Sequence, residues 1–185
     1  MLEEIVIAGF GGQGILSAGV ILAHASMDEG LNAAWIPSYG PEMRGGTANC
    51  TVIASDEQIG SPVTSHPTGV IVMNAPSFER FEPMVRSGGV LVVNSSLIEL
   101  RSRRTDIRVI PVPTNEIASA LGSALVGSIV AVGALLGARP FIRRTSVETA
   151  FASVLPAHRQ HLVPLNMKAL ERGMEVAGAA AGATV

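Results

Sequence analysis

The sequence is poor in cysteine, aromatic residues and charge, and each shortage argues against a class of function. Cys50 is the only cysteine among 185 residues, so this chain alone can build neither an intrachain disulfide, nor an iron–sulfur cluster, nor a cysteine-based zinc site. Aromatic residues make up only 4% and no dense lysine and arginine stripe occurs, which argues against nucleic-acid binding. Charged residues reach 15% against 48% apolar residues. We therefore expect the surplus apolar surface to be covered in a larger complex, or in a homo-oligomer when the chain is isolated.

The longest uncharged stretch, residues 117–138, is long enough to cross a bilayer. Its glycines and serines dilute its hydrophobicity, and Trp35 and Tyr39 are too far away to form an aromatic belt. We therefore predict a buried, close-packed helix, at a subunit contact, and no membrane span. The start of the chain, with Glu3 and Glu4, does not resemble a signal peptide, so the expected compartment is the cytoplasm.

The N-terminal pattern predicts a strand, a glycine loop, a helix and a second strand. Residues 5–8 are a short apolar run, and residues 15–29 place apolar side chains at helical spacing before Gly30. Residues 33–36 read as a strand that Pro37 ends. This order is typical of a parallel, Rossmann-like βαβ unit.

The rest of the chain predicts more strands and helices of the same kind of fold. Strands are expected at 49–55, 69–73, 90–94 and 107–112, where Pro111 indicates an edge position. A short helix begins near Pro76, Thr145 and Glu148 match a capping box for a helix to residue 154, and a last helix covers 166–177. We predict a single-domain α/β fold over residues 1–177, an open, mostly parallel sheet with helices on both faces, and a flexible Ala/Gly-rich tail at 178–185.

The glycine loop, residues 9–14, is the first candidate site. Gly9, Gly11 and Gly14 satisfy G-x-G-x-x-G between a strand and a helix, and Gly12 and Gln13 complete the turn. Glycines let a ligand approach the backbone, and the helix N-terminus offers N–H groups to a phosphate. A packing role for the glycines is the alternative, and we favour phosphate contact. An NAD-dependent enzyme would need an acid at the end of the second strand, where Ile36-Pro37-Ser38 stand instead, and Asp28 and Glu29 come too early.

The second loop, residues 38–47, follows the second predicted strand at the sheet edge where ligands of such folds bind. Its turn formers Gly40-Pro41 and Gly45-Gly46 flank Arg44. An arginine there suits a bidentate pair with a phosphate or a carboxylate. A solvated surface charge is an equally good interpretation from spacing alone.

Together the two loops resemble the gamma subunit of 2-oxoacid:ferredoxin oxidoreductases. The resemblance rests on Phe10-Gly11-Gly12-Gln13-Gly14 and on Tyr39-Gly40-Pro41-Glu42-Met43-Arg44-Gly45-Gly46. It continues through Ser55-Asp56-Glu57-Gln58-Ile59-Gly60-Ser61-Pro62 and Asn166-Met167-Lys168-Ala169-Leu170-Glu171-Arg172-Gly173, and so covers nearly the whole chain. Gly69, where relatives often have an acid, and Ser128, where they often have asparagine, depart from the family.

The resemblance implies a complex that oxidatively decarboxylates a 2-oxoacid, with 2-oxoglutarate favoured over branched-chain 2-oxoacids, to an acyl-CoA while reducing ferredoxin. It implies thiamine diphosphate and iron–sulfur clusters in partner alpha, beta and ferredoxin-like subunits, and coenzyme A handling by this subunit. The cofactor-binding candidates are Gly9, Gly11, Gly12, Gln13, Gly14, Tyr39, Arg44, Gly45 and Gly46. The beta subunit of indolepyruvate:ferredoxin oxidoreductase, a stand-alone nucleotide-binding oxidoreductase and a purely structural interaction module are the alternatives.

No catalytic or metal residues are predicted within the chain itself. His158 and His161 are spaced i, i+3 without a convincing third ligand, which favours a solvated helix end over a zinc site. Ser17 and Thr47 have no identifiable base, and Cys50 reads as a small buried strand residue. We expect activity only from the assembled complex.

Overall fold

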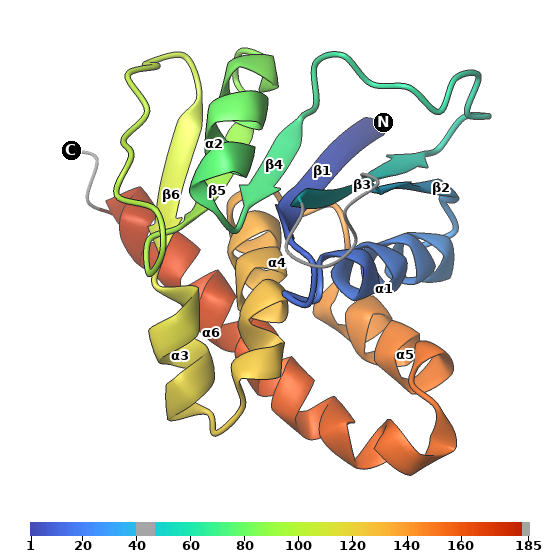
Figure 1. Cartoon of the computed structure of the whole chain (residues 1–185). Helices are drawn as coiled ribbons and strands as arrows, with labels where there is room; N and C mark the ends of the chain where they lie inside the picture. Colours follow the sequence, from blue (N-terminus) through green and yellow to red (C-terminus); the bar gives the residue numbers. More distant parts are fainter. Residues whose placement is uncertain (40–46, 183–185) are drawn as a thin grey trace.

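Six strands form one sheet in the order β2-β3-β1-β4-β5-β6 (Figure 1). This computed structural model describes residues 1–39 and 47–182. The strands are β1 (Leu2–Phe10), β2 (Asn32–Tyr39), β3 (Thr47–Ser55), β4 (Gly69–Val72), β5 (Val90–Asn94) and β6 (Arg108–Val112). β1, β4, β5 and β6 run parallel, whereas β3 lies antiparallel between β1 and β2. The predicted open, mostly parallel α/β sheet is confirmed.

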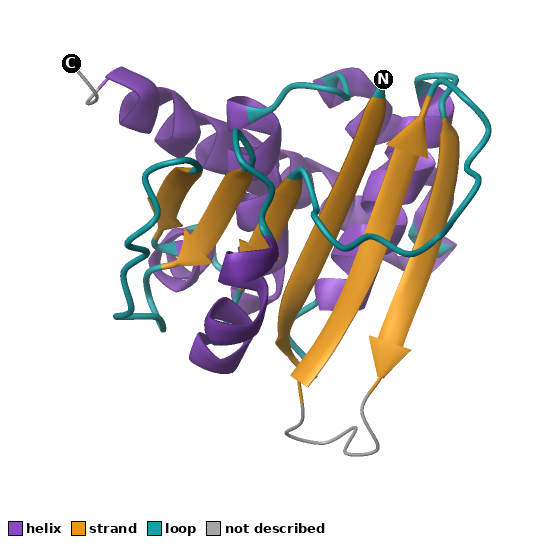
Figure 2. Ribbon diagram, turned by 90° about the horizontal axis from the view of Figure 1, so that it is seen from above, coloured by secondary structure: helices purple, strands orange, loops and turns teal. Residues whose placement is uncertain are grey.

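The helices cover the two faces of the sheet unequally. They are α1 (Ile15–Asp28), α2 (Ala75–Phe81), α3 (Thr114–Ala120), α4 (Gly127–Ala138), α5 (Arg144–Val154) and α6 (Val163–Gly182), with 3-10 turns η1 (Glu82–Met84), η2 (Ala124–Val126) and η3 (Ala157–Leu162). The larger core lies between the sheet and α1, α3 and α4, with α5 packed on α1 and α6 on α4. The smaller core lies under α2. Figure 2 shows a loop, and no helix, over β3 and β2 on that face, whereas α2 also contacts β1.

The predicted βαβ unit has its two strands parallel, as expected, but they are not neighbours in the sheet. β1 and β2 point the same way, yet β3 fills the place between them: Ile7 pairs with Cys50, and Cys50 pairs with Pro37. A short connection between neighbouring strands can only make an antiparallel hairpin, because parallel strands need a long crossover. The prediction that Pro37 ends the second strand is wrong, since β2 continues to Tyr39. An edge strand tolerates proline because its outer side needs no N–H donor. Pro111 does lie in an edge strand, as expected.

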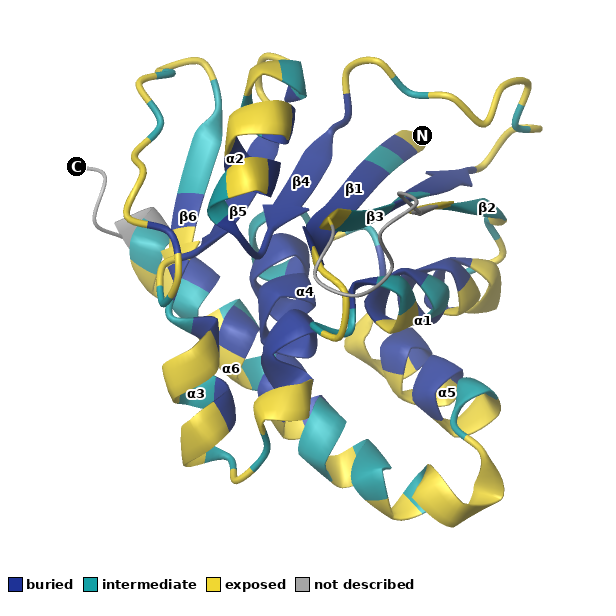
Figure 3. Ribbon diagram, in the orientation of Figure 1, coloured by how far each residue is buried: buried dark blue, intermediate teal, exposed yellow. Residues whose placement is uncertain are grey.

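The uncharged stretch 117–138 is not one helix. α3 ends at Ala120, Gly122 takes φ +85° and the chain passes through η2 before α4 begins. Gly122 and Ser123 donate backbone hydrogen bonds to Ser119 and Ala118, which closes the end of α3. α4 is buried as predicted (dark blue in Figure 3), but its cover is α6 of the same chain. No helix of the described residues is long and apolar enough to span a membrane.

Two helix ends also differ from the sequence prediction. α5 begins at Arg144 with no side-chain cap from its own N-cap residue, so the capping box at Thr145 and Glu148 is wrong. The Glu29 carboxylate, from the end of α1, accepts the Arg143 backbone N–H at 2.7 Å instead. α6 runs through Gly182, five residues beyond the predicted end at Ala177. Alanine is the strongest helix former, which explains the extension.

Candidate functional site

The glycine loop lies at the carboxyl edge of the sheet, where the strand order changes direction. It joins β1 to α1, and β1 has β3 on one side and β4 on the other. The chain leaves β1 toward β2 and β3, and then returns to build β4, β5 and β6 on the opposite side. In open α/β sheets this switch point is the place where ligands bind.

The loop backbone needs glycine at two of its residues. Gly12 has φ +91° and Gly14 has φ +76°, both in the left-handed region. Gly14 is the N-cap residue of α1, and its carbonyl accepts the Ala18 N–H at 2.9 Å. Neither a capping side chain nor an acidic residue is present in the first turn of this 14-residue helix. Its first N–H groups and the positive end of its dipole are therefore available to an anion.

The motif glycines divide into packed and open ones. A Cβ at Gly9 would lie within 2.9 Å of Gln13 Oε1, Ile15 Cδ1 and Met73 Cβ, and one at Gly14 would lie 2.7 Å from Ser128 Oγ. A Cβ at Gly12 would meet nothing within 4 Å. The packing interpretation therefore applies to Gly9 and Gly14, whereas Gly12 and the exposed Gly11 form the surface that a ligand can reach.

Gln13 points inward and holds the turn in place. Its Oε1 accepts the Phe10 N–H at 2.7 Å, and its Nε2 donates to the Met73 carbonyl at 3.4 Å. Asn94 Nδ2 donates to the same carbonyl at 3.4 Å. These bonds connect the glycine loop with the ends of β4 and β5. Both ends of the Gln13 amide are thus used by the protein's own backbone.

A hollow of about 310 Å³ lies beside the open part of the loop. It is lined by Phe10, Gly11, Gly12, Gly14, Ile15, Leu16, Ser17 and Ala48. The Ser17 residue is exposed in the first turn of α1, and Ala48 comes from the beginning of β3. The hollow therefore combines a helix N-terminus, a bare backbone turn and an apolar wall.

Strand pairing brings the ends of the second loop to the same place. Thr47 pairs with Phe10, the last residue of β1, and Tyr39 pairs with Ala48. Residues 40–46, which include Arg44, Gly45 and Gly46, lie outside the described residues. Tyr39 is placed by its backbone in β2. The structure thus brings the two predicted loops together at their described ends.

Two residues of this region escaped the sequence analysis as site residues. Ser128 at the start of α4 places its hydroxyl against Gly14, and Met73 supplies the carbonyl that Gln13 and Asn94 share. Ser128 is visible in the sequence only as a departure from the family, and nothing in its spacing indicates Gly14 as its neighbour. Contacts between segments so distant in sequence become visible only in the fold.

Other reactive residues lie outside this site. Cys50 is buried behind α1, and burial raises the pKa of its thiol to about 11, which keeps it protonated and unreactive. His158 and His161 are exposed in η3, and the described part of the chain contains no group of three or more metal-ligating side chains.

Comparison with known proteins agrees with this geometry. Residues 4–176 match the family model described as pyruvate ferredoxin/flavodoxin oxidoreductase. The chain belongs to this family. The resemblance to gamma subunits is confirmed by a solved structure, the gamma subunit of keto/oxoacid ferredoxin oxidoreductase from Geobacter sulfurreducens, which is 31% identical with a TM-score of 0.83. The match covers 97% of this chain and 98% of that one.

Two members of the family with curated names differ in how much of their length is matched. The 2-oxoglutarate synthase subunit KorC of Methanocaldococcus jannaschii is 32% identical, over 96% of this chain and 95% of its own. The ketoisovalerate oxidoreductase subunit VorA of Methanothermobacter marburgensis is 36% identical over 93% of this chain. This chain spans only 36% of the length of that VorA protein.

A second solved structure shares the fold of this chain. It is a 2-oxoglutarate:ferredoxin oxidoreductase from Magnetococcus marinus with 2-oxoglutarate, coenzyme A and succinyl-CoA bound. The TM-score is 0.85 over 96% of this chain and 31% of that one, at 22% identity. The same fold therefore also occurs as one part of a much longer polypeptide.

Proposed function

We propose that this chain is the gamma subunit of a complex that oxidatively decarboxylates a 2-oxoacid to an acyl-CoA and reduces ferredoxin. Support comes from its match to KorC over 95% of that subunit's length and to the separate gamma subunit of Geobacter sulfurreducens. Alpha and beta subunits would hold thiamine diphosphate, and a ferredoxin-like subunit would hold iron–sulfur clusters. A chain with one buried cysteine does not fit as the holder of such a cluster. The cytoplasmic location of the complex stays a prediction.

The role we propose for the glycine loop is to hold a phosphate of coenzyme A. The observation that carries this proposal is Gly12, which adopts φ +91° in open space two residues before the N-cap residue of α1, a helix start without a side-chain cap. Gly11, Gly12 and the first N–H groups of α1 would bind the phosphate oxygens, while Gly9 and Gln13 would shape the turn. Arg44 would add charge to the site or brace the second loop against a neighbouring subunit.

We favour 2-oxoglutarate as the substrate of the complex. The KorC subunit of Methanocaldococcus jannaschii matches over 95% of its own length, whereas this chain spans 36% of VorA. The higher identity to VorA supports a branched-chain 2-oxoacid as the second candidate. Assays of the assembled complex with 2-oxoglutarate, ketoisovalerate and indolepyruvate would separate these substrates, and turnover of indolepyruvate alone would favour the indolepyruvate enzyme.

The phosphate role is tested by a pair of glycine substitutions. Gly12 and Gly30 both have positive φ and open space at the Cβ position, but Gly30 lies at the other end of α1. Alanine should cost each position a similar ~1–2 kcal/mol of backbone strain. We expect Gly12→Ala in the assembled complex to raise the KM for coenzyme A about tenfold without changing the KM for the 2-oxoacid, and Gly30→Ala to change neither.

Two outcomes would count against these proposals in different ways. An unchanged KM for coenzyme A in Gly12→Ala would remove the phosphate role and favour a structural interaction module. Turnover by the purified chain without partners, or NAD binding to it, would favour a stand-alone nucleotide-binding oxidoreductase. The described end of β2 carries no acid for a ribose, and the Glu29 carboxylate is engaged by Arg143.

A further inference from the structure

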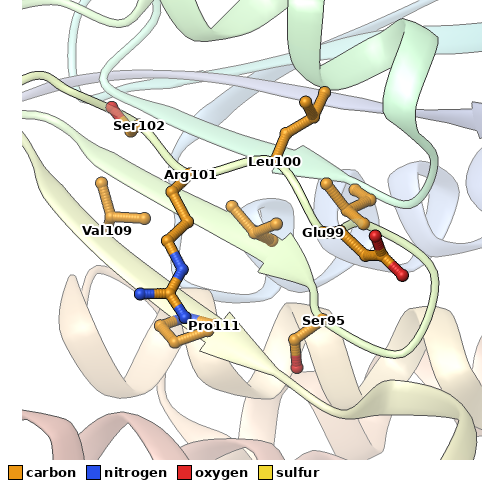
Figure 4. A pocket seen from close by; sticks show the side chains of 9 residues that line it. Ser95, Glu99, Leu100, Arg101, Ser102, Val109 and Pro111 are labelled. Atoms are coloured by element: carbon orange, nitrogen blue, oxygen red, sulfur yellow. The ribbon is translucent and has the colours of Figure 1, made fainter.

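A second hollow, of about 700 Å³, lies between strands β5 and β6 and the segment that joins them. We call residues 95–107 the β5–β6 arch. The walls of the hollow include Val93 of β5, Val109 and Pro111 of β6, and Ile98 and Leu100 of the arch (Figure 4). It shares no lining residue with the glycine-loop hollow. Its volume and its mostly apolar walls are typical of a small-molecule site.

The arch is fixed at both ends, so the hollow exists before any ligand arrives. At one end the Ser95 N–H donates to the Val112 carbonyl at 2.9 Å, and Ile98, 5% exposed, is part of the smaller core. At the other end Arg104 donates to the Val85 carbonyl at 2.6 Å, and Ser102 Oγ donates to Glu82 Oε1 at 2.6 Å. Ligand binding would therefore cost little conformational entropy in this segment.

One cation in the hollow has no charge partner. Arg101 makes no ion pair with any described residue, whereas Arg104 of the same arch pairs with Asp106. In Figure 4 the Arg101 side chain extends from the arch past Val109 toward Pro111, and the Glu99 carboxylate points toward the opposite end of the hollow. A guanidinium beside apolar walls matches a carboxylate that carries an apolar body.

We propose that this hollow binds a monocarboxylic acid with an apolar body. The carboxylate pairs with Arg101, and the apolar body lies against Val93, Ile98 and Val109. Such a ligand also covers Leu100, which is 42% exposed at the rim. The gain comes from a charge-assisted hydrogen bond together with the removal of apolar surface from water. The inference does not rest on the proposed function, because it involves neither the glycine loop nor a partner subunit.

Octanoate is the probe for this site. We expect its titration into the full-length, methyl-labelled chain to give saturable NMR shifts at the Ile98, Leu100 and Val109 methyls. Arg101→Gln should weaken binding about tenfold or more, the usual effect of losing a hydrogen bond between charged groups. The matched control is Arg103→Gln: Arg101 and Arg103 are both exposed, but Arg103 does not line the hollow, so its loss should leave affinity within about twofold.

Two further measurements keep the proposal falsifiable. Leu100→Ala removes a half-exposed wall that the fold does not need, and should weaken octanoate a few-fold. Octanol, which lacks the charge, should bind at least about tenfold more weakly than octanoate. The proposal is overturned if octanoate gives no saturable shifts at these methyls, if octanol binds equally well, or if Arg101→Gln and Arg103→Gln weaken binding to the same extent.

Discussion

At the scale of single residues, Glu29 joins two helices that are far apart in sequence. Its carboxylate accepts hydrogen bonds from Arg143, at 2.7 Å from the backbone N–H and 2.9 Å from Nε. Burial by itself would raise the pKa of this carboxyl, but the hydrogen bonds from Arg143 outweigh it, so the pKa lies below its usual value. Glu29 therefore contributes to stability through its ionised form.

The sign of this effect predicts a pH dependence. Because the folded-state pKa is lowered, the contribution is present above the unfolded-state pKa and is lost as pH falls through the folded-state value. We expect Glu29→Gln to lower the free energy of unfolding by less than about 1 kcal/mol near neutral pH. In acid, the unfolding free energies of the variant and the wild type should become equal. Urea unfolding over a pH series measures this, with the exposed Glu148→Gln as control. A difference that persists at low pH would contradict it.

Gln13 shows what residue identity alone leaves open. The sequence placed it among the cofactor-binding candidates because it stands inside the glycine motif. In the structure its amide binds the Phe10 N–H and the Met73 carbonyl, and a role in shaping the turn accounts for it. Its direction depends on β4 lying next to β1, which no local pattern specifies.

At the scale of elements, the crossing of α4 and α6 depends on glycines. A Cβ at Gly173 would collide with the Val130 carbonyl oxygen, and one at Gly133 with that of Leu170. Missing side chains let the two backbones approach closely, so that Ala131, Ala134 and Leu170 are fully buried. The small residues that made the stretch 117–138 resemble a subunit contact thus serve a contact within the chain.

This crossing predicts opposite effects of one substitution at two positions of α6. Gly173→Ala should destabilise the chain by about 1–3 kcal/mol, because the backbones must separate. Gly178→Ala, where nothing lies within 4 Å of the added Cβ, should be neutral or stabilising by up to ~1 kcal/mol, since alanine favours the helix. Thermal or urea unfolding measures both. Equal effects at the two positions would mean that the helices do not cross this closely.

At the scale of the whole molecule, low charge and unequal helix cover point to association. Only 15% of residues are charged, and apolar side chains such as Val63 and Leu125 are 75% and 79% exposed. Strands β3 and β2 have no described helix on the face that α2 covers elsewhere (Figure 2). A chain with these properties gains by covering apolar surface with a partner.

We therefore expect the isolated chain to self-associate, and its partners to displace that association. Sedimentation velocity should show a mass that rises with protein concentration in the micromolar range. Adding the proposed alpha and beta subunits should replace the homo-oligomer with a mixed complex. A chain that stays monomeric at all concentrations and does not bind these subunits would contradict the argument from composition.

The sequence by itself determined the features that depend on neighbours along the chain. Local patterns were enough to predict the glycine loop between β1 and α1, strand β5 at 90–94, the edge position of Pro111 and the family. Turns, strands and helix starts are governed by nearby residues. Only the tertiary structure decided that β3 lies between β1 and β2, that Glu29 caps α5 and that Ser128 reaches Gly14. These features depend on which segments meet across the core, and each segment's own pattern is compatible with several partners.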